Sequence, residues 1–167
     1  LGPVENTLHP GVGYGTKACG RALDRIVEMG GTWVAFTPFG RVWSTRTAAV
    51  DWSFEAPFED NKVAVAQAVQ QAHARGLHVM LVPHLWVERG DWRGEIEPLA
   101  GADIKRPDGG YVFQARATPA ALRTFATSYR RFVATWADVA EQQSVEMFSV
   151  GVELRSWVTS GRALPEL

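Results

Sequence analysis

Glu153 is the residue of this sequence whose type and position point most directly to chemistry. It follows an apolar run, residues 146–152, that is rich in strand-forming side chains. An ionisable group at the end of a buried strand is costly unless it finds partners or changes its protonation. The carboxyl is therefore a candidate general acid and base. The same position also fits a salt bridge with Arg155 or a carboxylate at the surface.

Polar and aromatic side chains gather after two other apolar runs. His84 and Trp86 follow residues 78–82, and Phe39 follows residues 33–36. An imidazole can hydrogen-bond a sugar hydroxyl or orient a neighbouring carboxyl, and an aromatic ring can lie against the apolar face of a pyranose. We therefore predict ligand contacts for these three residues. His84 fits equally well as a wall histidine with its hydrogen bonds satisfied.

Residues 89–118 are rich in Gly, Asp and Pro and show no sustained period, so we expect a long functional loop. Trp92 and Glu95 lie in it. We predict that Trp92 stacks on a flat ligand face and that Glu95 binds ligand hydroxyls. A solvated loop face is the simpler interpretation of Glu95.

The seven tryptophans are the unusual feature of the composition. Trp33 begins a predicted strand and Trp136 lies on the apolar stripe of a predicted helix, so both are expected in the core. Trp43, Trp52 and Trp157 follow strand ends and fit either a packing or a binding role.

Helices and strands are expected to alternate along the chain. Helical spacing of apolar residues predicts helices at residues 17–29, at residues 62–75 with Asp60 or Asn61 as the cap, and from Thr118-Pro119 onward. Short apolar runs predict strands at residues 33–36, 78–82 and 146–152. This order requires a parallel sheet with crossover helices.

A (β/α)8 barrel fits this order better than a nucleotide-binding doubly wound sheet, because no glycine-rich phosphate loop follows any of the predicted strands. In a barrel, the chemistry collects at the carboxyl ends of the strands, where Phe39, His84, Trp86 and Glu153 fall. A closed barrel takes about 250 residues. We therefore expect residues 1–167 to form one partial catalytic domain.

Composition excludes several classes of partner. The chain is 46% apolar, and 17 basic against 18 acidic residues give a net charge of -1, with no basic patch for nucleic acid or anionic lipid. No apolar run reaches the ~20 residues of a membrane span. The single cysteine, Cys19, is expected to pack, and no cofactor is expected. A metal-dependent hydrolase using His84, Glu88 and Glu153 is a weaker alternative, because paired His or Cys ligands are missing.

Three segments carry a resemblance to a known family. Their sequences are TPFGR at residues 37–41, PHLWV at residues 83–87 and SVGVEL at residues 149–154. In order and spacing they resemble the second, third and fourth strand ends of the β-mannanase-like glycoside hydrolases of family 113, in the barrel clan that includes cellulases. Members of the clan often place Asn before the acid/base glutamate, where this sequence has Val152.

The resemblance implies a retaining hydrolase of β-linked, mannan-like polysaccharide or oligosaccharide, with Glu153 as the acid/base residue. The family's nucleophile ends the seventh strand, which would lie beyond this chain. We therefore expect an incomplete barrel that lacks its first strand and its C-terminal half. Alone, it would be inactive, and it would aggregate, stay partly molten or assemble with a second half. The substrate class is typical of secreted or periplasmic enzymes. The alternative from another class is a carbohydrate-binding barrel without catalysis.

Overall fold

The computed structural model describes residues 11–46, 49–52, 57–97, 100–105, 107–109, 111–116 and 119–159. The chain divides into two compact units. Unit 1 consists of Leu1–Arg41, Asp51–Leu85 and Phe132–Val152, and unit 2 consists of Val42–Val50, Trp86–Arg131 and Glu153–Leu167. No helix in the described ranges is long and apolar enough to cross a membrane.

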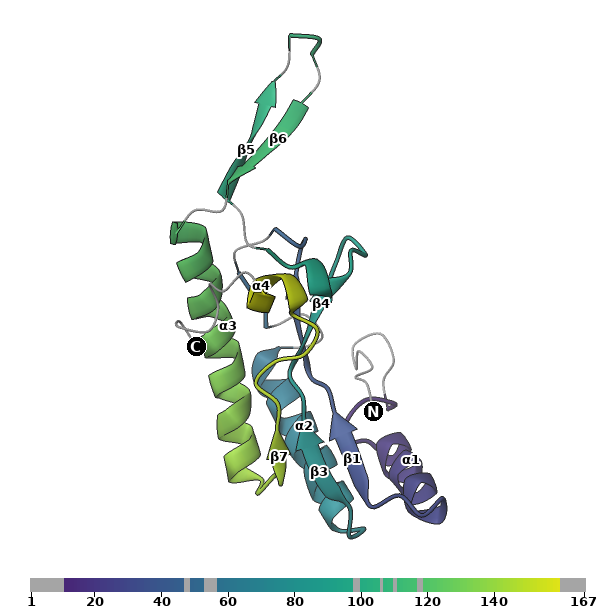
Figure 1. The fold of residues 1–167 in the computed structure, drawn as a ribbon. Helices are drawn as coiled ribbons and strands as arrows, with labels where there is room; N and C mark the ends of the chain where they lie inside the picture. Colours follow the sequence, from purple (N-terminus) through teal and green to yellow (C-terminus); the bar gives the residue numbers. More distant parts are fainter. Residues whose placement is uncertain are drawn as a thin grey trace. The chain divides into compact units, whose positions relative to one another are not determined.

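The centre of unit 1 is a parallel sheet. Strands β1 (Trp33–Phe36), β3 (His78–Leu81) and β7 (Met147–Phe148) lie side by side in the order β1-β3-β7 (Figure 1). Val34 pairs with Val79, and Leu81 pairs with Phe148. Alternate residues of β1 and β3 are fully or almost fully buried, as expected for β-branched and aromatic side chains that fill one face of a sheet. The predicted parallel neighbours are confirmed.

Two helices of unit 1 pack beside this sheet. Helix α1 (Lys17–Glu28) begins after Thr16, whose hydroxyl accepts from the Cys19 amide and caps the first turn. Helix α2 (Phe58–His73) contacts both α1 and β3. The predicted cap at Asp60 or Asn61 is wrong, because the helix already begins after Pro57 and Asn61 is buried within its first turns.

Helix α3 (Pro119–Gln142) begins at the predicted proline. Its cap, Thr118, lies outside the described residues. In unit 1, α3 contributes Phe132 and Trp136 to the core, and Trp136 packs edge-on against Phe58 with ring centroids 5.6 Å apart. In unit 2, it contributes Phe125 and Tyr129. The apolar stripe read from the sequence is therefore confirmed as a buried face.

Two further strands follow Pro38 and Pro83. Strand β2 (Phe39–Val42) pairs with β4 (His84–Val87) in a second, two-stranded sheet. A proline removes one donor from a ladder without ending it. Here the His84 amide donates to the Pro38 carbonyl at 2.9 Å, directly after Pro83. Strands β1 and β3 themselves end before these prolines, at Phe36 and Leu81.

The long loop predicted for residues 89–118 is also wrong in its second half. Strands β5 (Ala100–Lys105) and β6 (Tyr111–Arg116) form an antiparallel hairpin that closes at the pair Lys105 and Tyr111. Gly109, at φ +85, supplies the left-handed backbone of the turn. The sequence AGADIK of β5 is poor in strand formers, so periodicity gave no signal there.

Strand β7 is shorter than predicted. It consists of Met147 and Phe148, after which Val150 is 64% exposed and Ser149 Oγ donates to the Gly151 carbonyl at 3.0 Å. This local turn competes with the ladder, as serine hydroxyls often do. The predicted strand over residues 146–152 is therefore wrong beyond Phe148, and Glu153 follows a turn that leads into α4 (Arg155–Thr159).

Candidate active site

Glu153 lies in unit 2 with a side chain that is 47% exposed. Its backbone φ of +53 is in the left-handed region, which is unfavourable for a residue with a Cβ. The carboxylate Oε2 lies 3.2 Å from Nε of Arg93, in the short helix η1 (Arg93–Glu95). The ion-pair partner foreseen in the sequence, Arg155, makes a different contact.

Arg155 lies over the indole of Trp92, with its guanidinium carbon 4.7 Å from the ring centroid. This is a cation–π contact. A Cβ at Gly94 would lie only 2.5 Å from the same indole, so the ring needs a glycine beside it. Together with the ion pair of Arg93 and Glu153, the contact links residues 92–93, at the start of η1, to residues 153–155, at the start of α4.

The exposed tryptophans of unit 2 are surface rings that a flat ligand can reach. Trp86 is 45% exposed and Trp92 is 48% exposed. The Arg155 guanidinium covers part of Trp92, so a sugar that stacks on that face has to displace it. Glu95 is exposed on η1, and its amide donates to the Trp92 carbonyl at 3.0 Å.

Phe39 and His84 lie together in unit 1. Their ring centroids are 5.1 Å apart, with the planes tilted by 32°. The His84 Nδ1 accepts a hydrogen bond of 3.0 Å from the Leu85 amide. A neutral His84 therefore carries its proton on Nε2 and offers that atom as a donor. Two of the residues predicted from strand ends are thus brought together.

Burial decides the role of three further tryptophans. Trp136 is fully buried, as predicted, whereas Trp33 is 45% exposed, so its expected core role is wrong. Trp33 begins a strand whose buried face is occupied by Val34 and Phe36, and its own ring packs on His78 at 4.9 Å. Trp157 is a packing residue, buried against Phe125 and Tyr129 of unit 2.

Within the described ranges, no three His, Cys, Asp or Glu side chains are grouped so that they could hold a metal ion. The metal-dependent alternative built on His84, Glu88 and Glu153 finds no support there. Cys19 is buried, and burial raises the pKa of its thiol, which fits the predicted packing role.

Sequence reasoning missed two features. Arg93 lies in the segment expected to be a long loop, but its pairing with Glu153 depends on tertiary structure and has no sequence signal. The second feature is a cluster in unit 1, in which Glu146 contacts His78 at 3.2 Å and His73 at 3.3 Å.

Comparisons with known proteins agree on one family. The sequence profile of Glycoside Hydrolase Family 113 matches residues 9–162. None of the curated proteins matches the sequence. A solved structure of a "GH113 beta-1,4-mannanase", in a complex, is 20% identical with a TM-score of 0.69, and the match covers 92% of this chain and 46% of that one.

A second solved structure is the GH113 beta-mannanase AaManA from Alicyclobacillus acidocaldarius in complex with ManMIm. It is 26% identical with a TM-score of 0.65, and the match covers 91% of this chain and 46% of that chain. The chain therefore spans about half the length of the solved structures that it matches.

Proposed function

The chain belongs to glycoside hydrolase family 113, and we propose that it supplies the acid/base carboxylate of a hydrolase of β-linked mannan or mannan-like oligosaccharide. In this proposal residues 1–167 are part of one TIM-barrel catalytic domain. Strands β1, β3 and β7 are its second, third and fourth barrel strands. Their parallel order and the extent of the family match support the assignment.

Glu153 is the proposed general acid and base of a retaining mechanism. A retaining glycosidase needs a carboxyl that protonates the leaving oxygen and a second carboxylate about 5 to 5.5 Å away that attacks the sugar. Glu153 then takes a proton from the water that releases the sugar. The nucleophile is assigned to a part of the enzyme outside these 167 residues.

The single observation that carries this proposal is the placement of Glu153, which lies inside the family match and on a strained backbone. Left-handed non-glycine residues cluster at functional sites, where strain fixes a side chain in place. The carboxyl is also half exposed, so a glycosidic oxygen can reach it. Proton donation requires the contact with Arg93 to open, because a carboxylate in an ion pair holds no proton to give.

The remaining predicted residues are proposed to bind the sugar. Trp86 and Trp92 offer exposed rings for stacking, with Arg155 leaving the Trp92 ring when a sugar arrives. His84 offers its Nε2 proton to a hydroxyl, and Phe39 supports the imidazole. Glu95 accepts from hydroxyl groups at the exposed end of η1.

The test uses the complete enzyme, a β-1,4-mannan and the substitution Glu153→Gln. We expect kcat to fall by about 10² to 10⁴, with anomeric NMR of the unchanged enzyme showing retention. An aryl mannoside with a good leaving group needs no protonation, so its first chemical step should survive the substitution. Glu88→Gln, an exposed carboxylate of the same unit, is the matched control. Unchanged activity in Glu153→Gln, or a complete loss in the control, would contradict the proposal.

A further inference from the structure

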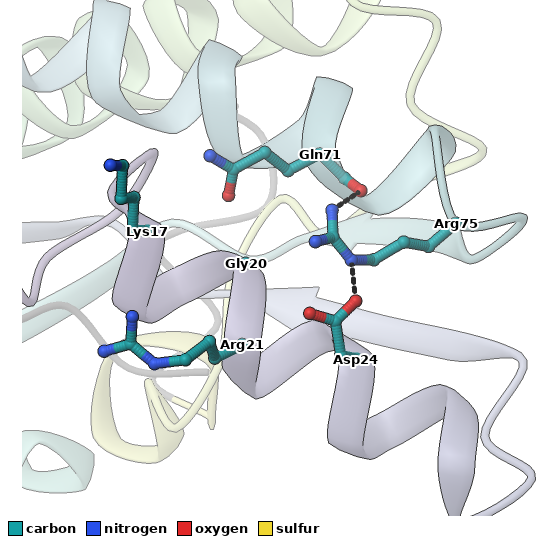
Figure 2. Close-up of a pocket in the computed structure, with 6 residues that line it drawn as sticks. All are labelled: Lys17, Gly20, Arg21, Asp24, Gln71 and Arg75. Carbon is teal, nitrogen blue, oxygen red and sulfur yellow. Dashed lines mark hydrogen bonds and ion pairs between the residues drawn. The ribbon is translucent and has the colours of Figure 1, made fainter.

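A pocket lies in unit 1, between α1 and the C-terminal end of α2. It has a volume of about 380 Å³ and is lined by Lys17, Gly20, Arg21, Asp24, Gln71 and Arg75. Figure 2 shows the α1 residues along one side, and Gln71 of α2 and Arg75, which follows α2, on the other. None of the residues proposed to bind the sugar belongs to it. Its volume is at the lower end of the range for small-molecule sites.

The lining carries more positive than negative charge. Lys17, Arg21 and Arg75 are cations, and Asp24 is the single carboxylate. Asp24 is already paired, because Arg75 Nε donates to its Oδ1 at 2.7 Å, and this hydrogen bond lowers the pKa of Asp24. Lys17 and Arg21 are exposed, one helical turn apart, and form no ion pair within the described ranges. Two uncompensated cations therefore border the pocket.

The floor of the pocket holds a buried acceptor without a donor. Gln71 Nε2 donates to the Gly15 carbonyl at 2.7 Å, and this bond fixes the orientation of the amide. The other end, Oε1, is buried and has no hydrogen-bond partner among the residues that the structure describes. Figure 2 shows this oxygen pointing toward Gly20. A buried acceptor left unpaired is costly, so a donor from a bound molecule is expected here.

Gly20 keeps the floor open. A Cβ at this position would lie 3.2 Å from Nη2 of Arg75 and 3.8 Å from Oε1 of Gln71. A glycine inside a helix lowers its stability, and here it leaves a space that both groups face. Arg75 Nε and Nη1 are occupied by Asp24 and by the Gln71 carbonyl. The Nη2 protons are left to donate into that space.

We propose that this pocket binds a small protonated oxyanion, namely hydrogen phosphate or the phosphate group of a small hydroxylated ester. The oxygens of the anion accept from Arg75 Nη2 and from Lys17 and Arg21, which are flexible enough to close over it. One hydroxyl of the ligand donates to Gln71 Oε1. Sulfate has the same shape and charge class but no proton to donate near neutral pH, so it lacks that hydrogen bond.

Titration calorimetry of the purified protein at constant ionic strength tests the proposal with sodium phosphate, sodium sulfate and glucose 6-phosphate. We expect saturable phosphate binding and at least about tenfold weaker sulfate binding, the usual effect of one lost hydrogen bond in a charged site. Tighter binding of glucose 6-phosphate than of phosphate identifies a phosphorylated sugar as the ligand. The reverse order identifies free phosphate. Absent phosphate binding, or equal binding of sulfate, overturns the proposal.

Variants locate the binding. Lys17→Gln and Arg21→Gln should each weaken phosphate binding by about tenfold, because each removes a charged donor. Arg25→Gln, an exposed arginine on the same helix outside the pocket, should leave binding unchanged. Gly20→Ala favours the helix but fills the floor, so it should abolish binding while the protein still unfolds cooperatively. Binding that survives both Lys17→Gln and Gly20→Ala would place the anion elsewhere and overturn the assignment.

Discussion

Glu146 Oε2 accepts a hydrogen bond of 2.8 Å from the backbone amide of Val79, so a side chain that directly precedes β7 is fastened to β3. The same carboxylate contacts His78 Nδ1 at 3.2 Å and His73 Nε2 at 3.3 Å. The parallel pairing of β3 with the two residues of β7 is thereby extended by side-chain contacts. Such contacts are expected to matter because so short a strand has few ladder hydrogen bonds of its own.

Acid should weaken the contacts of Glu146 with Val79, His78 and His73. Burial alone would raise the pKa of Glu146, but the hydrogen bonds from Val79, His78 and His73 outweigh it and hold the pKa at about 2, against 4.5 for a free carboxyl. A carboxyl whose pKa is lower in the folded protein than in the unfolded chain stabilises the fold at any pH above its unfolded-state pKa. This stabilisation is lost as the pH falls from the unfolded-state pKa to the folded-state pKa. We therefore expect the loss between about pH 4.5 and pH 2.

The measurement is the midpoint of thermal unfolding for the unchanged protein and for Glu146→Gln between pH 7 and pH 2. The unchanged protein should unfold at the higher temperature near neutral pH, and the two curves should converge toward pH 2. Glu141→Gln, which removes an exposed carboxylate without a side-chain partner in the described part of the chain, should follow the unchanged protein throughout. A constant gap between the Glu146→Gln curve and the unchanged curve would exclude this role.

The sequence predicted the central elements of the fold because their signals are local. Helices α1 and α3 and strands β1 and β3 begin where proline and apolar runs placed them. The hairpin of β5 and β6 escaped prediction because Ala, Gly and Asp in β5 are weak strand formers that only pairing with β6 holds extended. Val34 and Phe36 are buried and Trp33 is not, because of the face of β1 that meets the helices. The sequence of a four-residue strand does not specify that face.

The candidate site was predictable by residue type and only partly by geometry. Phe39 and His84 follow adjacent apolar runs, so their contact follows from the parallel order of strands. The ion pair of Glu153 with Arg93 joins residues 60 positions apart on a turn and a short helix, and no local pattern encodes it. The left-handed backbone of Glu153 has no signal either, since Gly or Asn is the usual residue there.

Trp136 and Trp33 provide a matched test of burial. Trp136→Ala should destabilise unit 1 by about 3–5 kcal/mol, because a fully buried ring leaves a cavity beside Phe58. Trp33→Ala should cost less than about 1.5 kcal/mol, because the ring is half exposed and loses mainly its contact with His78. Chemical denaturation of both variants measures the difference. Equal losses would show that Trp33 is buried in solution.

The contact of Arg155 with Trp92 should be measurable as a coupling energy. A double-mutant cycle with Arg155→Gln and Trp92→Leu isolates the pair from the other contacts that each residue makes. We expect a coupling of about 0.5–1 kcal/mol, typical of an exposed cation–π pair. Arg89→Gln, which replaces an exposed arginine of the same unit, should show no coupling with Trp92→Leu. Additive effects in the first cycle would mean that the guanidinium does not rest on the ring.

Backbone strain at Ser144 offers a way to stabilise the protein outside the candidate site. Ser144 follows α3 at φ +54, a conformation that costs a residue with a Cβ about 1–2 kcal/mol. Glycine avoids this cost, but it makes the unfolded chain more flexible, and this flexibility lowers the stability of the folded protein by about 0.4–1 kcal/mol. Ser144→Gly should therefore raise the free energy of unfolding by about 0.5–1 kcal/mol with the same catalytic activity. A lower unfolding midpoint would contradict this assignment of strain.

The same strain at Glu153 can be separated from the chemistry of its side chain. Glu153→Gln and Glu153→Gly both remove the carboxylate and its ion pair with Arg93, but only the glycine variant relaxes the φ of +53. Both variants should lose the acid/base activity of the complete enzyme. Glu153→Gly should nevertheless be more stable than Glu153→Gln by about 0.5–1 kcal/mol, by the balance of strain and chain entropy that applies at Ser144. Denaturant unfolding of the two variants measures this difference directly. Equal stabilities would mean that the turn holds Glu153 without strain, and the placement of the carboxyl would then rest on Arg93 alone.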